Sequence, residues 1–393
     1  MKIMSINAGS SSLKFSLFNM DDNSLITSGL FERIGIDGIF TIKYNGEKTK
    51  INKNFNNHKE AVEYLLEQLI ELKIINSLNE IDAVGHRLVH GGDKYSDSVL
   101  ITDEVIEDAK KLSELAPSHN PANIIGIETF KQVLPNTPMV AVFDTAFHST
   151  LTPDAYLYSV PYEWYKEYGV RKYGFHGTSH KFISKTIGEY LKRDDLKVIC
   201  CHLGNGASVS AIKSGKCIDT SMGFTPNAGL MMGTRAGDID TTMIPFIMSK
   251  TGKTLDEVIN DLNKKSGFLG ISELSSDLRD ITNAADNENN EQASLARKMF
   301  VRRVVGYISM YNTYLNGADV ICFTGGIGEN SVAVREMIIN DLEVLGVKLD
   351  KEKNNNVVED VELVSTDDSK IACYVIKTNE ELMIAEDTMK LAK

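Results

Sequence analysis

The chain has 393 residues, 42% hydrophobic and 24% charged, which is too long for one ordinary hydrophobic core and favours two lobes. Its formal net charge of -12, without a basic block, argues against nucleic acid or an anionic membrane as a partner. We expect a cytoplasmic protein with reduced thiols, because the sequence shows no signal peptide, no membrane-spanning run and no C-x-x-C pair among its five cysteines.

The chain begins with the pattern of a β-meander. MSINAGSSSLKFSLF (residues 4–18) places a turn rich in small hydrogen-bond donors between two apolar strands. In TIKYNGEKTKI, Asn45-Gly46 predicts a hairpin turn. The first lobe therefore starts as consecutive antiparallel strands.

Further elements of the first lobe follow the meander. Residues 57–73 have helical spacing, and IDAVGHRLVHGG reads as a strand running into a glycine turn. Asn120-Pro121 predicts a helix cap followed by proline. The strand MVAVF should deliver Asp144 at its carboxyl end.

A second set of elements resembles the first. KVICCHL, GNGAS and VSAI read as strand, small-residue turn and strand, as at the start of the chain. A long helix is expected over about 292–315, stopped by Gly317, and FTGGIGEN then follows a strand as a glycine turn before a helix. This internal similarity favours a duplicated lobe.

The two donor-rich turns predict anion binding, because backbone N–H groups and hydroxyls in a tight turn can converge on phosphate oxygens. One such turn alone is more often an ordinary hairpin, but two of them, each opening a lobe, favour a polyphosphate. The common nucleotide motifs are absent. TGKT at 251–254 has Ile247 where a P-loop needs glycine, and no G-x-G-x-x-G occurs.

Nine blocks together resemble the acetate kinase family of the acetate and sugar kinase/Hsc70/actin superfamily. They are NAGSSSLKFSLF, GHRLVHGG, FDTAFH, YGFHGTSH, CHLGNGASVSA, DTSMGFTP, MGTRAGDID, FTGGIGEN and TNEEL, in the family's order. The resemblance implies an α/β protein with two similar lobes of the actin-like ATPase (ribonuclease H-like) type and the active site in the cleft between them. We expect a first lobe over 1–149, joined by 379–393 returning as a helix, and a nucleotide-binding lobe over 150–378.

The resemblance also implies an activity: reversible, direct in-line transfer of the ATP γ-phosphoryl group to acetate, giving ADP and acetyl phosphate. The implied metal is Mg²⁺, with Mn²⁺ as a substitute, held near Asn7 and Glu380. A homodimer is expected. In a site that transfers a phosphoryl group, cationic side chains and Mg²⁺ supply most of what the protein contributes.

Arg87 and Arg235 are the leading cationic candidates, because both lie beside glycines at strand-to-loop positions. The family match implies catalytic roles for Arg87, Arg235, Asp144 and His176. Acetate is a carboxylate that is already ionised, so we expect Asp144 to orient Arg87 or a metal-bound water instead of removing a proton. Further acceptor-site residues implied by the match are Val89, His119, Phe175 and Pro226. Ser118 departs from the apolar residue expected there, which predicts a roomier acceptor pocket.

Nucleotide contacts are expected from Lys14 and from three segments, each of which is rich in glycine or lies at the start of a helix. The residues implied by the resemblance are Lys14; His202, Leu203, Gly204, Asn205 and Gly206; Asp277, Leu278 and Arg279; and Gly325, Gly326, Ile327, Gly328 and Glu329. Lys14 follows the first donor-rich turn, where a cation would neutralise bound phosphate.

Two histidine pairs, His86/His90 and His176/His180, have the H-x-x-x-H spacing of metal ligands on a helix. The first pair reads as strand, where residues four apart cannot chelate one ion, and the second lacks the glutamate of H-E-x-x-H. A transition metal is therefore disfavoured. His180 is either part of the active site or a structural histidine that bridges two loops.

Two alternatives stay open at this point. A nucleotide-switched interaction protein of the actin or Hsp70 kind would share the fold, and fold alone does not separate the classes. The motifs HRLVHGG, YGFHGTSH and MGTRAGD favour a kinase, because a switch would not need an acceptor site. Within the kinases, a propionate or butyrate kinase is the nearest alternative.

Overall fold

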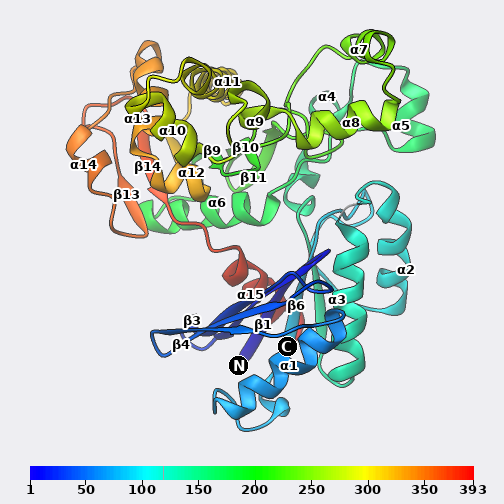
Figure 1. Ribbon diagram of the computed structural model, residues 1–393. Helices are drawn as coiled ribbons and strands as arrows, with labels where there is room; N and C mark the ends of the chain where they lie inside the picture. Colours follow the sequence, from blue (N-terminus) through cyan, green and yellow to red (C-terminus); the bar gives the residue numbers. More distant parts are fainter. Residues whose placement is uncertain (118) are drawn as a thin grey trace. The chain divides into compact units, whose positions relative to one another are not determined.

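The structure is a computed structural model that describes residues 1–117 and 119–393. The chain forms two compact units (Figure 1). Unit 1 comprises Met1–Phe147 and Asn379–Lys393, and unit 2 comprises His148–Thr378. The carboxyl-terminal segment therefore belongs to the same unit as the amino terminus.

Unit 1 is built on an eight-stranded sheet of order β5-β4-β3-β2-β1-β6-β8-β7. The first five strands form an antiparallel meander, and β6 and β8 extend it as parallel strands. The predicted hairpin is confirmed, since β4 and β5 pair around Asn45 and Gly46. The strands are β1 Lys2–Gly9, β2 Ser12–Asn19, β3 Ser24–Glu32, β4 Ile39–Tyr44, β5 Glu47–Asn52, β6 Ala83–Leu88, β7 Val99–Leu100 and β8 Met139–Phe143.

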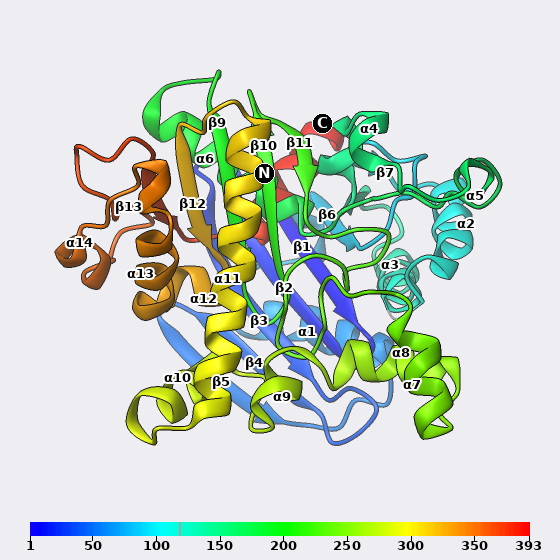
Figure 2. The same ribbon diagram turned by 90° about the horizontal axis from the view of Figure 1, so that it is seen from above.

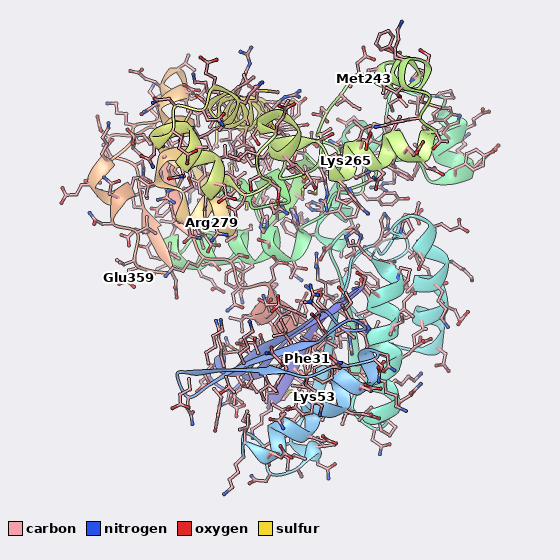
Figure 3. All side chains as sticks on the ribbon, in the orientation of Figure 1. Phe31, Lys53, Met243, Lys265, Arg279 and Glu359 are labelled. Atoms are coloured by element: carbon pink, nitrogen blue, oxygen red, sulfur yellow. The ribbon has the colours of Figure 1, made fainter. Side chains whose placement is uncertain are left out.

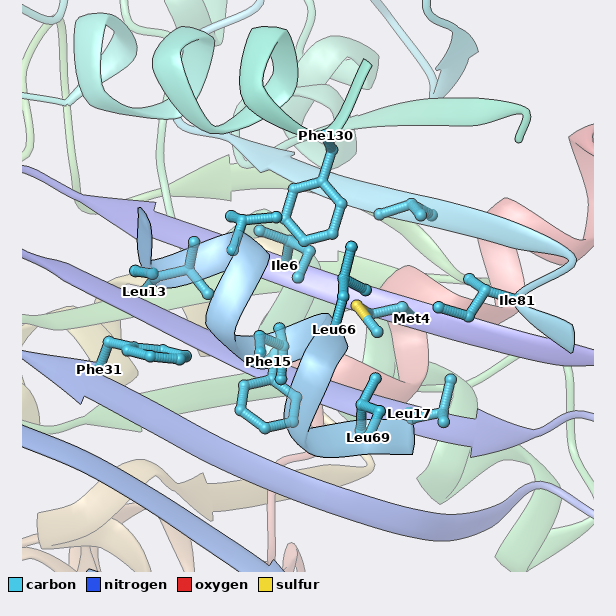
Figure 4. Close-up of a cluster of buried hydrophobic side chains, with 14 of the residues drawn as sticks. Met4, Ile6, Leu13, Phe15, Leu17, Phe31, Leu66, Leu69, Ile81 and Phe130 are labelled. Atoms are coloured by element: carbon cyan, nitrogen blue, oxygen red, sulfur yellow. The ribbon is translucent and has the colours of Figure 1, made fainter. Parts of the chain in front are cut away.

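Helices cover both faces of this sheet because successive strand residues point to opposite sides. Met4 and Ile6 on β1 pack against Leu66 of α1 and Phe130 of α3 in one buried cluster (Figure 4). Ile3, the residue before Met4, packs on the other face with Ala385 of α15. Helix α15 therefore packs on strands of the unit 1 sheet. The helices are α1 His58–Glu71, α2 Asp103–Lys111, α3 Asn120–Val133 and α15 Glu380–Leu391, with 3-10 turns at Leu78–Glu80 and Leu112–Glu114.

Unit 2 contains a six-stranded sheet of order β11-β10-β9-β12-β14-β13. Antiparallel β9, β10 and β11 are extended by β12 and β14, which run parallel to β9. Unit 1 has the same arrangement in β3-β2-β1-β6-β8, so the duplication predicted from the sequence is confirmed. The strands are β9 Lys197–Leu203, β10 Ala207–Lys213, β11 Lys216–Thr220, β12 Val320–Thr324, β13 Val361–Leu363 and β14 Ala372–Ile376.

The long helix α11 packs on β9 and β10, and α6 packs on β9 from the other face of the sheet (Figures 1 and 2). The predicted long helix is confirmed to within one residue at each end. The helices of unit 2 are α4 Pro153–Tyr156, α5 Tyr162–Tyr168, α6 Gly177–Leu191, α7 Met243–Thr251, α8 Leu255–Lys264, α9 Gly267–Ser272, α10 Leu278–Asn287, α11 Glu291–Tyr314, α12 Gly325–Asn330, α13 Val332–Asp341 and α14 Lys351–Asn355, with a 3-10 turn at Glu343–Leu345. Another 3-10 turn, Ala146–Thr150, lies where the chain first passes between the units.

Two local predictions need correction. Strand β6 ends at Leu88, so His86 lies on the strand but His90 lies beyond it. Helix α3 takes His119 as its N-cap, not Asn120, because the Asn120 side chain binds the backbone of His90 instead. Among the described residues, no helix is both long and apolar enough to cross a membrane.

Candidate active site

Arg87 and Asp144 form an ion pair at the carboxyl ends of two neighbouring parallel strands of unit 1. Arg87 Nε lies 3.0 Å and 3.2 Å from the two carboxylate oxygens, and Nη2 lies 2.5 Å from Oδ2. Asp144 is 1% exposed. Burial by itself lowers the pKa of Arg87, but the charge and hydrogen bonds of Asp144 outweigh burial and hold that pKa above its ordinary value. Arg87 is therefore a fixed, oriented cation.

Asn7 and Glu380 add oxygen donors beside this pair. Arg87 Nη1 donates to Asn7 Oδ1 at 3.4 Å. Glu380 opens α15, and its pKa is raised to about 7, first by burial and then by the charges of Asp144 and Glu381, against the lowering effect of Arg87. Carboxylate and amide oxygens are the ligands that Mg²⁺ prefers, usually few in number and completed by water. The donor set thus fits the metal that the resemblance implies.

Lys14 lies opposite Asn7 in the β1–β2 pairing. Its ammonium group forms an ion pair with Glu381, the second residue of α15. The Lys14 side chain is 50% exposed, so it can also reach a ligand in solvent. Lys14, predicted to bind phosphate, and Asn7, predicted to bind the metal, therefore lie side by side on β2 and β1. Glu380, the other predicted metal ligand, lies on α15, which packs on both strands.

Two residues predicted for the acceptor site lie on the loop after β6 and at the start of α3. Val89 is buried, and its N–H donates to Asn123 Oδ1 at 3.2 Å. The Asn120 side chain accepts from His90 N and donates to His90 O, both at 3.1 Å. Two asparagines of α3 thus fasten the loop that follows Arg87, and His119 is the N-cap of the same helix. Ser118, predicted to make the pocket roomier, lies outside the described residues.

In unit 2, Arg235 is partly buried and has no carboxylate partner among the residues that the structure describes. Its Nη1 donates to Pro226 O at 3.3 Å, and burial lowers its pKa. A methyl group in place of the Gly206 α-hydrogen would lie 3.3 Å from His176 Nε2 and 3.6 Å from Arg235 Nη1. Arg235, His176 and the glycine turn therefore meet at one place, which is suited to an anion.

His176 is held in an unusual conformation at this place. It is the N-cap of α6 with φ of 57° and ψ of 22°, a left-handed geometry that non-glycine residues seldom adopt and that often marks a functional site. Its Nδ1 lies 2.9 Å from Ser208 Oγ, and its ring lies 4.3 Å from that of His202. Phe175, predicted for the acceptor pocket, precedes it and is buried, with its carbonyl bound by His148 Nε2 at 2.9 Å.

A cavity of about 1150 Å³ opens in unit 2 beside the glycine turn between β9 and β10. Gly204 and Asn205 line one side, Asp277 to Arg279 at the start of α10 another, and Gly326 and Ile327 of α12 a third. Figure 3 labels Arg279 at the start of α10. Its side chain is 90% exposed and pairs with Asp277. Three segments far apart in the sequence thus line one cavity, which is large enough for a nucleotide.

Comparison with known proteins decides the family. The model of the acetokinase family matches residues 2–386. Acetate kinase of Bacillus subtilis (strain 168) is 56% identical over 100% of both chains. The crystal structure of Porphyromonas gingivalis acetate kinase superposes with a TM-score of 0.95 at 43% identity over 100% of both chains. The chain belongs to the acetokinase family. A propionate kinase from Francisella tularensis subsp. tularensis SCHU S4 is also similar, with a TM-score of 0.94 and 41% identity over 99% of both chains.

The expected nucleotide residues of this acetokinase divide into two groups. Those on the cavity wall are Gly204, Asn205, Asp277, Leu278, Arg279, Gly326 and Ile327. Those that do not line it are Lys14, which belongs to unit 1, and His202, Leu203, Gly206, Gly325, Gly328 and Glu329. Within unit 2, members of the second group adjoin the lining segments in sequence. Glu329 Oε1 accepts from Gly325 N at 2.9 Å and from Thr378 N at 3.0 Å.

Some supporting residues of this acetokinase had no sequence signal. Arg335 is 1% exposed and donates to the carbonyl oxygens of Gly328 and Glu329 and to the side chain and carbonyl of Asn354. It thereby ties α12, which lines the cavity, to α14. The acceptors are mostly backbone carbonyls, and only the folded chain shows which carbonyls an arginine will meet.

Proposed function

We propose that this acetokinase transfers the γ-phosphoryl group of ATP to acetate, reversibly, forming ADP and acetyl phosphate. An acetate oxygen attacks the γ-phosphorus in line, and the bond to the bridging oxygen breaks, with its electron pair leaving on ADP. No proton has to be removed, because the attacking group is an ionised carboxylate.

The observation that carries the proposal is Arg235. An arginine that is partly removed from water loses solvation free energy, and a carboxylate usually offsets that loss. Arg235 has none among the described residues, and it lies beside His176 and the glycine turn. A phosphoryl group in transfer is the anion that such a site would stabilise, through charge and hydrogen bonds in place before the reaction.

Arg87 would bind the acceptor in this proposal. Asp144 orients its guanidinium through Nε and Nη2, which leaves the Nη1 side directed toward Asn7 and able to meet a carboxylate. Asp144 is then a positioning residue and not a general base. Val89, His119, Phe175 and Pro226 are proposed to enclose the acetate methyl group.

The cavity of unit 2 is proposed as the nucleotide site, with the base and ribose along α10 and α12 and the phosphates toward Gly204 to Gly206. The remaining predicted nucleotide residues would act by supporting these segments, and Lys14 by neutralising phosphate from unit 1. Asn7 and Glu380 are proposed to hold Mg²⁺, directly or through water. Bound there, Mg²⁺, or Mn²⁺ in its place, would neutralise phosphate charge.

The test is an assay of purified protein with Mg-ATP and acetate, in which acyl phosphate is trapped with hydroxylamine, beside a sample without acceptor. The proposal predicts hydroxamate formed in proportion to ADP, and little ADP without acetate. ATP hydrolysis that is unaffected by acetate, with no hydroxamate, would instead favour a nucleotide-switched interaction protein.

We further propose that the protein acts as a homodimer in the cytoplasm, without nucleic acid or membrane as a partner. Support comes from the family resemblance and from the net charge of -12, which disfavours polyanions. Sedimentation velocity at micromolar concentration tests the dimer, and a single species of 43.5 kDa would contradict it.

A further inference from the structure

A serine hydroxyl joins two histidines in the interior of unit 2. Ser208 Oγ lies 2.9 Å from His176 Nδ1 and 2.8 Å from His180 Nε2. The two histidines are one helical turn apart at the start of α6, and His180 N donates to His176 O at 3.0 Å. Ser208 is the second residue of β10, directly after the glycine turn, and is fully buried.

The protonation of His180 is fixed by its surroundings. Its side chain is fully buried, and burial, followed by the neighbouring rings of His148 and His202, lowers its pKa well below the ordinary value, so the ring is neutral. Within residues 1–117 and 119–393, its Nδ1 has no hydrogen-bond partner. A neutral imidazole carries one N–H group. If the hydrogen were on Nδ1, it would be a buried donor without an acceptor. Such a donor is rarer and more costly than a buried acceptor without a donor.

The proton of His180 therefore belongs on Nε2, where it donates to Ser208 Oγ. A serine hydroxyl has a single hydrogen. Since Ser208 accepts from His180, its own hydrogen is free to donate to His176 Nδ1. His176 Nδ1 is then an acceptor, and the proton of a neutral His176 lies on Nε2. Nε2 is the atom that faces Gly206 and the Arg235 guanidinium.

We propose that His180 and Ser208 form a relay that fixes the tautomer of His176, so that its Nε2–H donor faces the place where the phosphoryl group is transferred. Ser208 and His180 are positioning residues, since each acts only through His176. This inference rests on the proposed function for what the donor stabilises. The tautomer itself can be measured without substrate.

The first test is nitrogen NMR of the full-length protein labelled with ¹⁵N-histidine, at pH 8 and without ligand. The ring signals of His176 are assigned by comparison with His176→Gln. The relay predicts that His176 carries its proton on Nε2 and that its Nδ1 is unprotonated. A proton on Nδ1 in the wild-type protein would overturn the relay, whether or not the protein phosphorylates acetate.

The second test compares two buried serines of the same strand. Ser208→Ala removes the relay, whereas Ser210→Ala, two residues on and also fully buried, removes a hydroxyl bonded to Thr220 and to no histidine. Loss of a residue that orients a metal-ligating histidine commonly costs about 10- to 100-fold in activity, and we take that range as the guide for His176. We expect a fall of that size in kcat for Ser208→Ala, with KM for ATP little changed, and near-normal kcat for Ser210→Ala.

A conservative variant separates positioning from folding. His180→Gln keeps an N–H donor near the position of Nε2, and His180→Leu does not. We expect His180→Gln to retain the His176 Nε2–H tautomer and most of the activity, and His180→Leu to lose both. Equal kcat and an unchanged tautomer in Ser208→Ala and in both His180 variants would refute the proposal. If Ser208→Ala fails to fold, the wild-type spectrum and His180→Gln still decide it.

Discussion

At the scale of single residues, unit 2 contains two arginines with opposite surroundings, the partly buried Arg235 and the fully buried Arg335. Arg235 donates to one backbone carbonyl and contacts one thioether sulfur, whereas Arg335 donates to four oxygen acceptors. Burial lowers the pKa of both, that of Arg335 to about 10. The contrast indicates that Arg335 stabilises the fold, and it is consistent with the ligand role that we propose for Arg235.

Arg235→Ala should lower kcat by about 100-fold or more, as loss of a charge positioned in advance within a desolvated site does. The free energy of unfolding should stay the same or rise, because the variant removes a desolvated charge. Steady-state kinetics and urea unfolding check both expectations. Near-normal kcat in a folded variant would rule out the assigned role.

Arg335→Ala, in contrast to Arg235→Ala, should lower the free energy of unfolding. It leaves buried oxygens of Gly328, Glu329 and Asn354 without donors, and each unsatisfied group costs about 1 to 3 kcal/mol. We therefore expect the free energy of unfolding to fall by about 3 kcal/mol or more. Urea unfolding beside Arg235→Ala is the matched comparison, and equal stability of the two variants would contradict this account.

At the scale of elements, the turn between β9 and β10 depends on a glycine from another segment. Gly233 N donates to Asn205 O at 2.9 Å, and a methyl group on Gly233 would lie 1.6 Å from Asn205 Oδ1. Asn205 lines the cavity. The shape of the proposed phosphate turn is therefore set partly by the absence of a side chain at Gly233.

Gly233→Ala should raise KM for ATP several-fold, because the Asn205 side chain must leave its position on the cavity wall. Gly306→Ala is the control, since its methyl group meets nothing within 4 Å in helix α11. That control should keep KM and gain about 0.5 to 1 kcal/mol in stability. Unchanged KM for ATP in Gly233→Ala would show that Asn205 does not contact the nucleotide.

Strand β6 carries a histidine whose charge state should affect stability. His86 is buried against Phe130, its Nε2 has no hydrogen-bond partner among the described residues, and burial lowers its pKa from 6.5 to about 3. The unfolded chain therefore binds this proton at a higher pH than the folded chain. Stability from this residue is complete above pH 6.5 and is lost as pH falls below that value.

The variant His86→Leu should have a shallower loss of stability in acid. Between pH 6 and 5, the wild-type protein should lose about 1.4 kcal/mol more than the variant, the value of one pH unit for a single proton. Urea unfolding at the two pH values measures the difference. Parallel losses in the two proteins would mean that His86 titrates normally.

How far the sequence predicts the elements depends on the range of the contacts involved. The hairpin at Asn45-Gly46 and helix α11 follow from local turn chemistry and periodicity, and both are confirmed. The cap at Asn120 was wrong because its side chain binds the backbone of His90, thirty residues away. The relay through Ser208 had no signal either, since α6 and β10 meet only in the folded chain.

At the scale of the whole molecule, the candidate residues divide between the units. Arg87, Asp144, Asn7 and Glu380 belong to unit 1, and Arg235, His176 and the cavity belong to unit 2. The order of motifs along the chain made the family predictable, and it supplied both sets of candidate residues. Local sequence patterns did not predict the contacts that support the cavity wall, such as those of Arg335 with Asn354, because these contacts join different elements of the folded chain.

The choice of acceptor is the central claim that similarity leaves open, because an acetate kinase and a propionate kinase are both similar to this chain. Apolar pockets discriminate one methylene by roughly 10- to 200-fold. The family resemblance favours the smallest acceptor, acetate. Butyrate should be poor in any case, since Phe175 and Pro226 are proposed to close the far end of the pocket.

The most direct measurement is a competition assay in which purified protein converts Mg-ATP with acetate, propionate and butyrate together, and the acyl phosphates are separated as hydroxamates. We predict that acetate has the highest kcat/KM, that propionate is accepted at a measurably lower value, and that butyrate is poor. A higher kcat/KM for propionate or butyrate than for acetate would contradict the acceptor assignment, while formation of no acyl phosphate at all would contradict the proposed reaction.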